Sequence, residues 1–120
     1  MMIKLIIFMY ILPPSVSSVK MEIEQSSLTN KEIVLSQAIL ETGWFKSYSC
    51  RVRNNLFGLT KPNGGYFEFD HWAESVKGYK TMIQYRFRKG EGYYKFLKRI
   101  GYASDTNYIQ KIKQIVLKIK

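Results

Sequence analysis

The sequence contains one cysteine and one histidine, and its His, Cys, Asp and Glu residues do not recur at the spacing of a metal site. A single cysteine, Cys50, cannot form a disulfide within the chain. No internal repeat or low-complexity tract is present. The longest apolar run, residues 5–12, is too short to span a bilayer. We therefore expect neither a disulfide framework nor a repeat architecture, and no metal or other cofactor.

The overall composition is typical of a folded protein. The 120 residues give room for one domain, and 46% of them are apolar and 15% aromatic. Such a chain buries enough apolar surface to be globular rather than disordered.

The first 17 residues are set apart from a domain that we expect over residues 18–120. Lys4 precedes the apolar run, and two prolines and several serines follow it, which is the layout of a secretory signal. We expect cleavage near residues 15–18 and a secreted, periplasmic or cell-wall location. The alternative is an uncleaved segment that packs against the domain. In either case, residues 15–27 are expected to contribute a short helix.

The excess of positive charge lies entirely in the C-terminal part. Residues 77–120 hold 12 Lys or Arg and 2 acidic residues, whereas residues 1–76 hold 7 of each, so the net charge of +10 belongs to the second segment. Such asymmetry attracts polyanions, among them cell-wall polymers, anionic membranes and nucleic acids. A solvated face that keeps a small enzyme soluble would have the same composition.

The C-terminal end of a helix predicted between Thr29 and Gly43 contains the best candidate for a catalytic residue. Thr29 and Glu32 have the spacing of a capping box, and nearly continuous apolar residues follow until Gly43, which predicts a buried helix. Glu41 falls on its last turn. A carboxyl group at the mouth of an apolar helix is poorly solvated, which raises its pKa toward the range where it donates a proton near neutrality. An ion pair with a basic neighbour such as Lys46 is the alternative role.

Periodicity and turn signals predict the remaining elements. They are a polar loop over residues 47–54, a hairpin over residues 55–69, helices over about 70–86 and 93–100, and a last helix from Ser104 or Asp105. In the hairpin, alternation puts Tyr66 and Glu68 on one face and Phe67 and Phe69 on the other. Asp70 is the expected N-cap of the helix that follows. The fold class is therefore α+β and mostly helical, with a short β-hairpin lobe.

Three ordered blocks between residues 28 and 116, and a fourth, weaker one, resemble one known family. Residues 36–45, SQAILETGWF, are similar to its Ala-Gln-Ala-x-x-Glu-Ser-Gly-Trp-Gly, and residues 54–58 to its Asn-Asn-Leu-Phe-Gly. Residues 101–108, GYASDTNY, are similar to its Gly-Tyr-Ala-Thr-Asp-Pro-x-Tyr, and residues 69–79 resemble a helix start in which Glu74 is a capping glutamate. The family is that of the bacterial glucosaminidases, lysozyme-like peptidoglycan hydrolases of glycoside hydrolase family 73 that are related to the flagellar rod-cap hydrolase domain. Thr42 and Phe45 depart from the family's usual serine and glycine.

The resemblance implies a lysozyme-like fold and an endo-β-N-acetylglucosaminidase that hydrolyses the glycan strand of peptidoglycan. It implies Glu41 as general acid and Tyr102 as a supporting catalytic residue. The expected substrate-binding residues are Trp44, Asn55, Phe57 and Tyr79, for which loop anchoring and core packing are the alternatives. We expect a monomer whose partners are glycan strands and anionic wall polymers rather than nucleic acid.

The second catalytic group is less clearly indicated. Many members of the family carry a second glutamate in a longer β-lobe, and Glu68, with Asp70 behind it, is the nearest candidate in the short lobe of this chain. A solvated hairpin position is its alternative. The N-acetyl group of the substrate could instead act as the internal nucleophile.

Two other functions remain open from the residues alone. The basic C-terminal part and its tyrosines would suit a non-catalytic module that binds cell wall or nucleic acid. Cys50 and His71 could form the nucleophile and base of a wall peptidase, although Cys50 lies in a basic loop without an evident third group.

Overall fold

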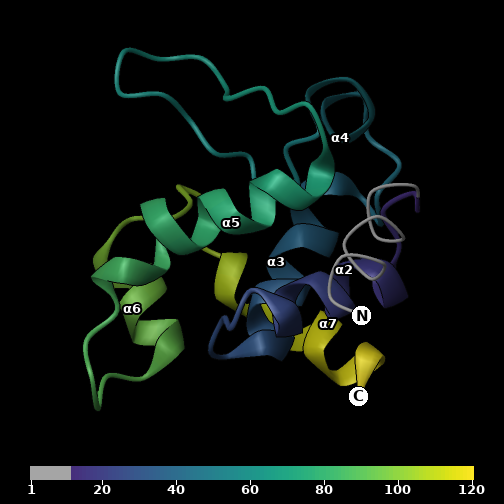
Figure 1. Ribbon diagram of the computed structural model, residues 1–120. Coiled ribbons are helices and arrows are strands. Elements are labelled where there is room, and N and C mark those ends of the chain that lie inside the picture. Colours follow the sequence, from purple (N-terminus) through teal and green to yellow (C-terminus); the bar gives the residue numbers. More distant parts are fainter. Residues whose placement is uncertain (1–11) are drawn as a thin grey trace.

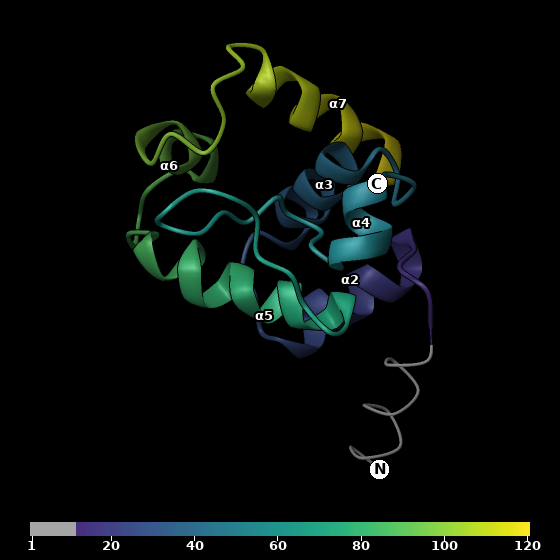
Figure 2. The same ribbon diagram turned by 90° about the horizontal axis from the view of Figure 1, so that it is seen from above.

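The computed structural model describes residues 12–120, so the apolar run of the predicted export signal lies largely outside the described residues. The elements are α2 (Val16–Gln25), α3 (Lys31–Thr42), α4 (Tyr48–Arg53), α5 (Trp72–Met82), the 3₁₀ helix η1 (Gln84–Arg86), α6 (Tyr93–Arg99) and α7 (Tyr108–Ile119). Figures 1 and 2 show α3 between α5 on one side and α7 on the other. The mostly helical prediction is confirmed. None of these helices is long and apolar enough to cross a membrane.

Helix α3 is the centre of the packing. It lies along α7 and α2, and α2 in turn contacts α5. Its buried residues face in several directions, as expected for a helix with almost no polar face: Val34, Leu35, Ser36, Gln37, Ala38, Ile39 and Thr42. The position of Glu41 on its last turn is therefore set by a helix that is enclosed on several sides.

The predicted capping box at the start of α3 is wrong. The N-cap is Asn30, in a left-handed conformation and without a side-chain capping bond. The main chain of Thr29 is instead bound by Gln84, whose amide accepts from the Thr29 N–H at 2.9 Å and donates to its carbonyl at 3.0 Å. A contact with a residue distant in sequence thus overrides the local capping signal.

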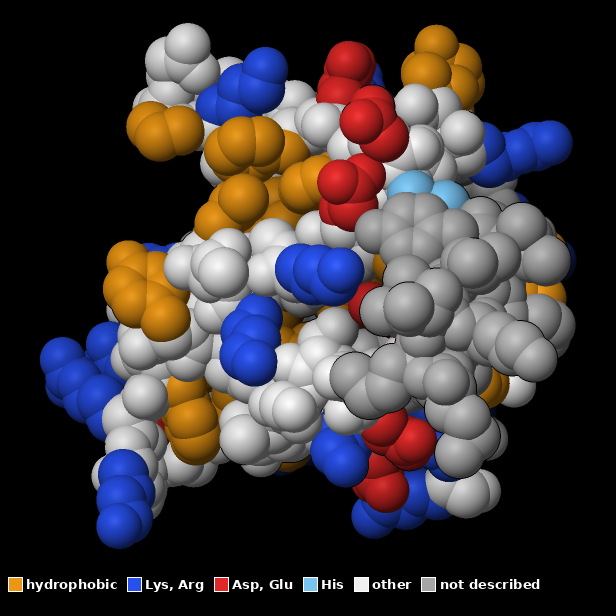
Figure 3. Space-filling view, in the orientation of Figure 1, with side chains coloured by type: hydrophobic (Ala, Val, Ile, Leu, Met, Phe, Trp, Pro, Cys, Tyr) orange, Lys and Arg blue, Asp and Glu red, His pale blue; other side chains and the backbone are white. Residues whose placement is uncertain are grey.

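The predicted hairpin is an irregular loop that projects from the body of the molecule (Figures 1 and 3). A single antiparallel bridge joins Thr60 and Tyr66, and no strand forms in residues 12–120. Two main-chain hydrogen bonds cross the loop, from the Lys61 N–H to the Gly65 carbonyl and from the Phe67 N–H to the Leu59 carbonyl, both at 2.9 Å. The side chain of Asn55 adds three more. Its amide nitrogen donates to the carbonyls of Leu59 and Phe67 at 2.9 and 3.0 Å, and its oxygen accepts from the Leu59 N–H at 3.0 Å. The predicted alternation still holds, because Tyr66 and Glu68 are exposed and Phe67 and Phe69 half-buried.

His71 and Glu74 together cap the N-terminus of α5. His71 is the N-cap in place of the expected Asp70, and its Nδ1 accepts from the Ala73 N–H at 3.1 Å. Glu74 accepts from the His71 N–H at 2.9 Å. The capping role expected for Glu74 is therefore confirmed.

Two further boundaries differ from the prediction. The polar loop expected over residues 47–54 contains α4, which Ser47 caps by accepting from the Cys50 N–H at 3.1 Å. Helix α7 begins at Tyr108, later than expected, because Asp105 accepts from the Asn107 N–H at 2.9 Å and forms a local turn.

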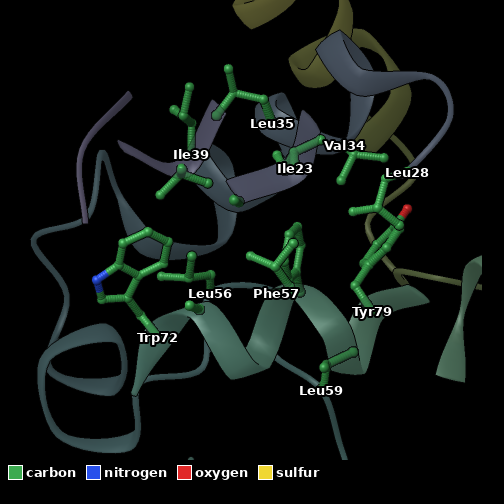
Figure 4. Close-up of a cluster of buried hydrophobic side chains, with 14 of the residues drawn as sticks. Ile23, Leu28, Val34, Leu35, Ile39, Leu56, Phe57, Leu59, Trp72 and Tyr79 are labelled. Atoms are coloured by element: carbon green, nitrogen blue, oxygen red, sulfur yellow. The ribbon is translucent and has the colours of Figure 1, made fainter. Parts of the chain in front are cut away.

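The core joins the loop to the helices. Figure 4 shows Leu56, Phe57, Trp72 and Tyr79 beside α5, opposite side chains that include Ile23 and Ile39. All of these side chains are at most 2% exposed. Because Leu56 and Phe57 lead directly into the projecting loop, core packing fixes the point where the loop begins.

We predict that Asn55→Ala lowers the free energy of unfolding by about 2–4 kcal/mol, since it removes three hydrogen bonds and leaves buried main-chain groups unpaired. Urea unfolding followed by circular dichroism measures this loss. The exposed Asn63 in the same loop supplies the matched control, Asn63→Ala, which should change stability little. Equal stability of the two variants would contradict the anchoring role of Asn55.

Candidate active site

A cleft of about 1000 Å³ opens between the projecting loop, the end of α5 with η1, and the turn between α6 and α7. We call it the main cleft. Its aromatic lining is Phe57, Tyr66, Phe67, Tyr85, Tyr102 and Tyr108. In Figure 3 apolar side chains gather between the projecting loop and α5. Aromatic rings with a few polar groups among them are typical of a site for a small organic ligand or one part of a polymer.

Glu41 lies in the wall of the main cleft. The residue is exposed toward the cleft, yet the surrounding protein removes enough water from its carboxyl group to raise the pKa. A hydrogen bond with the Tyr108 hydroxyl partly offsets this rise. The carboxyl group is therefore protonated over a wider pH range than an ordinary glutamate, as a proton donor requires.

Gly58 allows the loop to approach this carboxyl group. A Cβ atom built at Gly58 would lie 3.2 Å from Oε2 of Glu41, and the residue has a φ of +64°. Only glycine adopts this left-handed conformation without steric cost and leaves the adjacent space free. The loop that follows Asn55 therefore forms one side of the site of Glu41.

A chain of hydrogen bonds leads from Gln84 to Tyr108, which lies beside Glu41 in the wall of the main cleft. Gln84 donates to the Tyr93 hydroxyl at 3.1 Å, which lies 2.6 Å from that of Tyr79. Tyr79 donates to Gln37 at 2.5 Å, and Gln37 donates to the Tyr108 hydroxyl at 3.2 Å. Because the only proton of Tyr79 is used toward Gln37, Tyr93 must donate to Tyr79. All donors thus point in one direction, which leaves the Tyr108 proton for Glu41.

Tyr102 holds the loop in place from the other side. Its hydroxyl donates to the carbonyl of Phe57 at 2.9 Å, and its ring stacks on that of Tyr108 at a centroid distance of 5.7 Å. Burial, and then the neighbouring Tyr108 and Glu41, raise its pKa well above the ordinary value, so it remains a neutral phenol. Tyr102 therefore fixes the residue before Gly58 and, through it, the contact with Glu41.

A family model described as mannosyl-glycoprotein endo-beta-N-acetylglucosaminidase matches residues 18–120. The chain belongs to the glucosaminidase family. A comparison with curated proteins finds none that matches it. Membership supports a glycoside hydrolase of the kind that acts on the glycan of peptidoglycan.

The two departures from the usual glucosaminidase motif have structural counterparts. Thr42 keeps the hydroxyl of the usual serine, which donates to the Ala38 carbonyl at 2.7 Å and accepts from the Phe45 N–H at 2.8 Å. Phe45 replaces a glycine and has a φ of +66°, a left-handed conformation that glycine adopts more easily. Its side chain is half-buried and packs against the core, which offsets this conformation.

The other residues expected to bind substrate occupy different environments. Phe57 lines the main cleft, whereas Asn55 and Tyr79 are buried beneath it. Trp44 lies in a separate hollow, and Glu68 is not part of the cleft lining. The structure thus brings Glu41, Tyr102 and Phe57 together in one cleft and leaves Glu68 outside it.

Asp105 is the other carboxylate of the main cleft lining. It is exposed and pairs with Lys111 at 2.6 Å. The bond from Lys111, with that from the Asn107 N–H, lowers its pKa, so that it is ionised where Glu41 is still protonated. The environment of the cleft therefore raises the pKa of Glu41 and lowers that of Asp105.

Cys50 and His71 do not present the features of a cysteine peptidase. Cys50 is buried, and burial raises the pKa of its thiol to about 11. His71 uses Nδ1 as the acceptor that caps α5. A thiolate nucleophile is disfavoured at this position. Within residues 12–120, no group of three or more His, Cys, Asp or Glu is arranged to hold a metal ion.

The sequence interpretation did not assign roles to Gly58, Gln37 or Tyr108 at the site. Gln37 lies one helical turn before Glu41, and this spacing was a usable signal for a neighbouring side chain. Tyr108 is the last residue of the GYASDTNY block. Its contact with Glu41 requires α3 and α7 to be packed together, which no local pattern specifies.

We predict that Gly58→Ala lowers the free energy of unfolding by about 1–2 kcal/mol through backbone strain and also displaces Glu41. The matched control is Gly43→Ala, which has a φ of +56° but no atom within 4 Å of the added Cβ. Urea unfolding and peptidoglycan hydrolysis should show similar stability losses but a much larger activity loss for Gly58→Ala. Equal activity of the two variants would show that the close approach at Gly58 does not matter.

Proposed function

We propose that this glucosaminidase is an endo-β-N-acetylglucosaminidase that cleaves the glycan strand of peptidoglycan with Glu41 as its general acid. The observation that carries this proposal is the raised pKa of Glu41 in the main cleft, with Gly58 against the carboxyl group and Tyr108 bonded to it. An acid with these properties can protonate the leaving oxygen of a glycosidic bond.

The hydrogen bonds that lead from Gln84 to Tyr108 suit a step in which Glu41 becomes negatively charged. When Glu41 gives its proton to the glycosidic oxygen, its own carboxyl group becomes negative. The Tyr108 hydroxyl accepts a hydrogen bond from Gln37, so its own proton is available to that charge. Such prearranged donors stabilise developing charge without having to reorient during the reaction.

We further propose that Glu41 is the single protein carboxylate that takes part directly. Glu68 is absent from the cleft lining, and Asp105 is engaged by Lys111. The acetamido oxygen of the substrate would attack the anomeric carbon as the bond to the leaving oxygen breaks. Water would then open the cyclic intermediate, with ionised Glu41 accepting its proton.

The walls of the main cleft suit a glycan. Tyr66 and Tyr85 are 48% and 71% exposed at its edge, so their rings are available to the apolar faces of sugars. Arg86 and Lys111 add positive charge to the same lining. Peptidoglycan lies outside the cytoplasm, and we propose export of the protein, in keeping with the apolar N-terminal run, and action as a monomer.

We predict that Glu41→Gln lowers kcat on purified peptidoglycan by about 100- to 10,000-fold, since glutamine cannot supply the proton. Release of reducing sugars measures this loss. The matched control is Asp105→Asn, which removes the other carboxylate of the cleft and should retain most activity. A loss of the same size in Asp105→Asn would contradict the single-acid mechanism, and a wild-type protein that binds peptidoglycan but releases no sugar would be a binding module.

We predict that Tyr108→Phe moves the alkaline limb of the kcat/KM profile to higher pH. The Tyr108 hydroxyl lowers the pKa of Glu41, so its removal raises this pKa, and a general acid stays protonated up to a higher pH. At lower pH the rate should fall about tenfold, because the carboxylate that forms has one donor fewer. Tyr48→Phe, at a 72% exposed residue of α4, is the control. An unchanged alkaline limb in Tyr108→Phe would exclude this role.

A further inference from the structure

Trp44 combines two features that are unfavourable for a residue with only a packing role. Its side chain is 43% exposed, and its backbone has a φ of +61°, in the left-handed region. Glycine or asparagine would adopt this conformation at lower cost and would expose less apolar surface. Strained residues of this kind cluster at functional sites, which makes the surroundings of Trp44 informative.

Trp44 lies in a hollow of about 350 Å³ between the end of α3 and one face of α7. We call it the Trp44 hollow. Its lining is Leu40, Trp44, Asn107, Gln110, Lys111, Gln114, Ile115 and Lys118. The hollow has the size of a site for one small unit of a ligand rather than for a long segment.

The lining has the chemistry of a sugar site. The Trp44 ring offers an aromatic face to the apolar side of a pyranose ring. Asn107, Gln110 and Gln114 carry amides, each able both to donate and to accept hydrogen bonds with hydroxyl and acetamido groups. A lipid surface would not use three amides in this way, and nucleic acid would be expected to contact more of the basic side chains.

The charges of the hollow favour an anionic substituent. Lys118 is exposed on the last turn of α7, and none of the carboxylates in residues 12–120 pairs with it. Lys111 also lines the hollow, but its ammonium group pairs with Asp105 at 2.6 Å, so that Lys118 carries the unpaired charge. In peptidoglycan, carboxylates are borne by the lactyl-linked peptides of alternate sugars, at a spacing that a glycan strand repeats.

The Trp44 hollow adjoins the main cleft. Leu40 and Lys111 line both, and Leu40 immediately precedes Glu41 in α3. One strand that occupies the main cleft can therefore extend along the end of α3 into the Trp44 hollow.

We propose that the Trp44 hollow is an accessory subsite for a distant sugar of the glycan strand that is cut in the main cleft. Trp44 stacks on this sugar, the amides of α7 bind its polar groups, and Lys118 pairs with the carboxylate of its substituent. The proposal rests on the proposed function and adds to it a preference for long, peptide-bearing strands over short oligosaccharides.

The experiment compares KM for purified polymeric peptidoglycan with KM for a short N-acetylglucosamine oligomer that fills the main cleft alone. Trp44→Asn removes the ring while keeping a residue that tolerates a left-handed backbone. It should raise the ratio of KM for the polymer to KM for the oligomer about tenfold, with little change in kcat on the polymer. Lys118→Gln should raise the ratio in the same direction.

Two matched variants serve as controls. Tyr48→Ala removes another exposed aromatic ring near the end of α3 but outside the hollow, and Lys113→Gln removes a lysine of α7 that lies 5.2 Å over the Tyr94 ring. Both should leave the ratio unchanged. Thermal unfolding should show Trp44→Asn to be at least as stable as the wild type, so that a loss of fold does not imitate a loss of binding.

The outcomes separate the accessory subsite from the proposed function. A wild type that hydrolyses both substrates, together with an unchanged ratio in Trp44→Asn, overturns the subsite and leaves the function intact. An equal rise in both KM values also overturns it, because Trp44 would then belong to the main cleft. A wild type that hydrolyses neither substrate overturns the proposed function, on which the subsite depends.

Discussion

The narrow space between Gly58 and the carboxyl group of Glu41 is the constraint on which the site depends. It requires a residue without a side chain, in a left-handed conformation, where the projecting loop lies beside the end of α3. Three features hold the loop in that position: the core packing of Phe57, the hydrogen bond from Tyr102 to its carbonyl, and the buried amide of Asn55. The motif that contains Asn55 and Gly58 therefore acts as one structural unit, with its anchor in the core and its glycine at the acid.

The polar groups behind Glu41 have a corresponding role. Buried polar side chains are costly unless they are bonded, and no unpaired buried side-chain polar atom is found in residues 12–120. Gln37 and Tyr79 meet this requirement by bonding to each other and to their neighbours in an order that presents a donor to Glu41. The same bonds that make these residues tolerable in the core thus orient the group that stabilises the ionised acid.

Sequence reasoning succeeded where the signal was either local or carried by an ordered motif. The apolar run of α3, the position of Glu41 on its last turn and the alternation of residues 66–69 follow from periodicity alone. Family membership was recognisable from the SQAILETGWF, NNLFG and GYASDTNY blocks, and the family match over residues 18–120 confirms it. The export signal and the catalytic roles of Glu41 and Tyr102 stay predictions. The role expected for Glu68 is also untested, and this residue lies outside the lining of the main cleft.

The errors occurred where distant residues decide the local structure. Gln84 binds the main chain of Thr29 and displaces the expected capping box. In the expected hairpin, side-chain bonds from Asn55 supplement a single bridge where strands were expected. The hydrogen bonds from Gln84 to Tyr108 join residues from five separate segments of the chain. Such a network becomes visible only once the helices are packed, because each of its residues alone fits an ordinary core position.

The central claim is that the protein environment keeps the carboxyl group of Glu41 protonated beyond the range of an ordinary glutamate. The most direct measurement is a carbon-13 NMR titration of the glutamate carboxyl groups, with the Glu41 signal assigned by its absence in Glu41→Gln. We expect a midpoint above the ordinary value of 4.5 in the wild type. A midpoint at or below 4.5 would contradict the account.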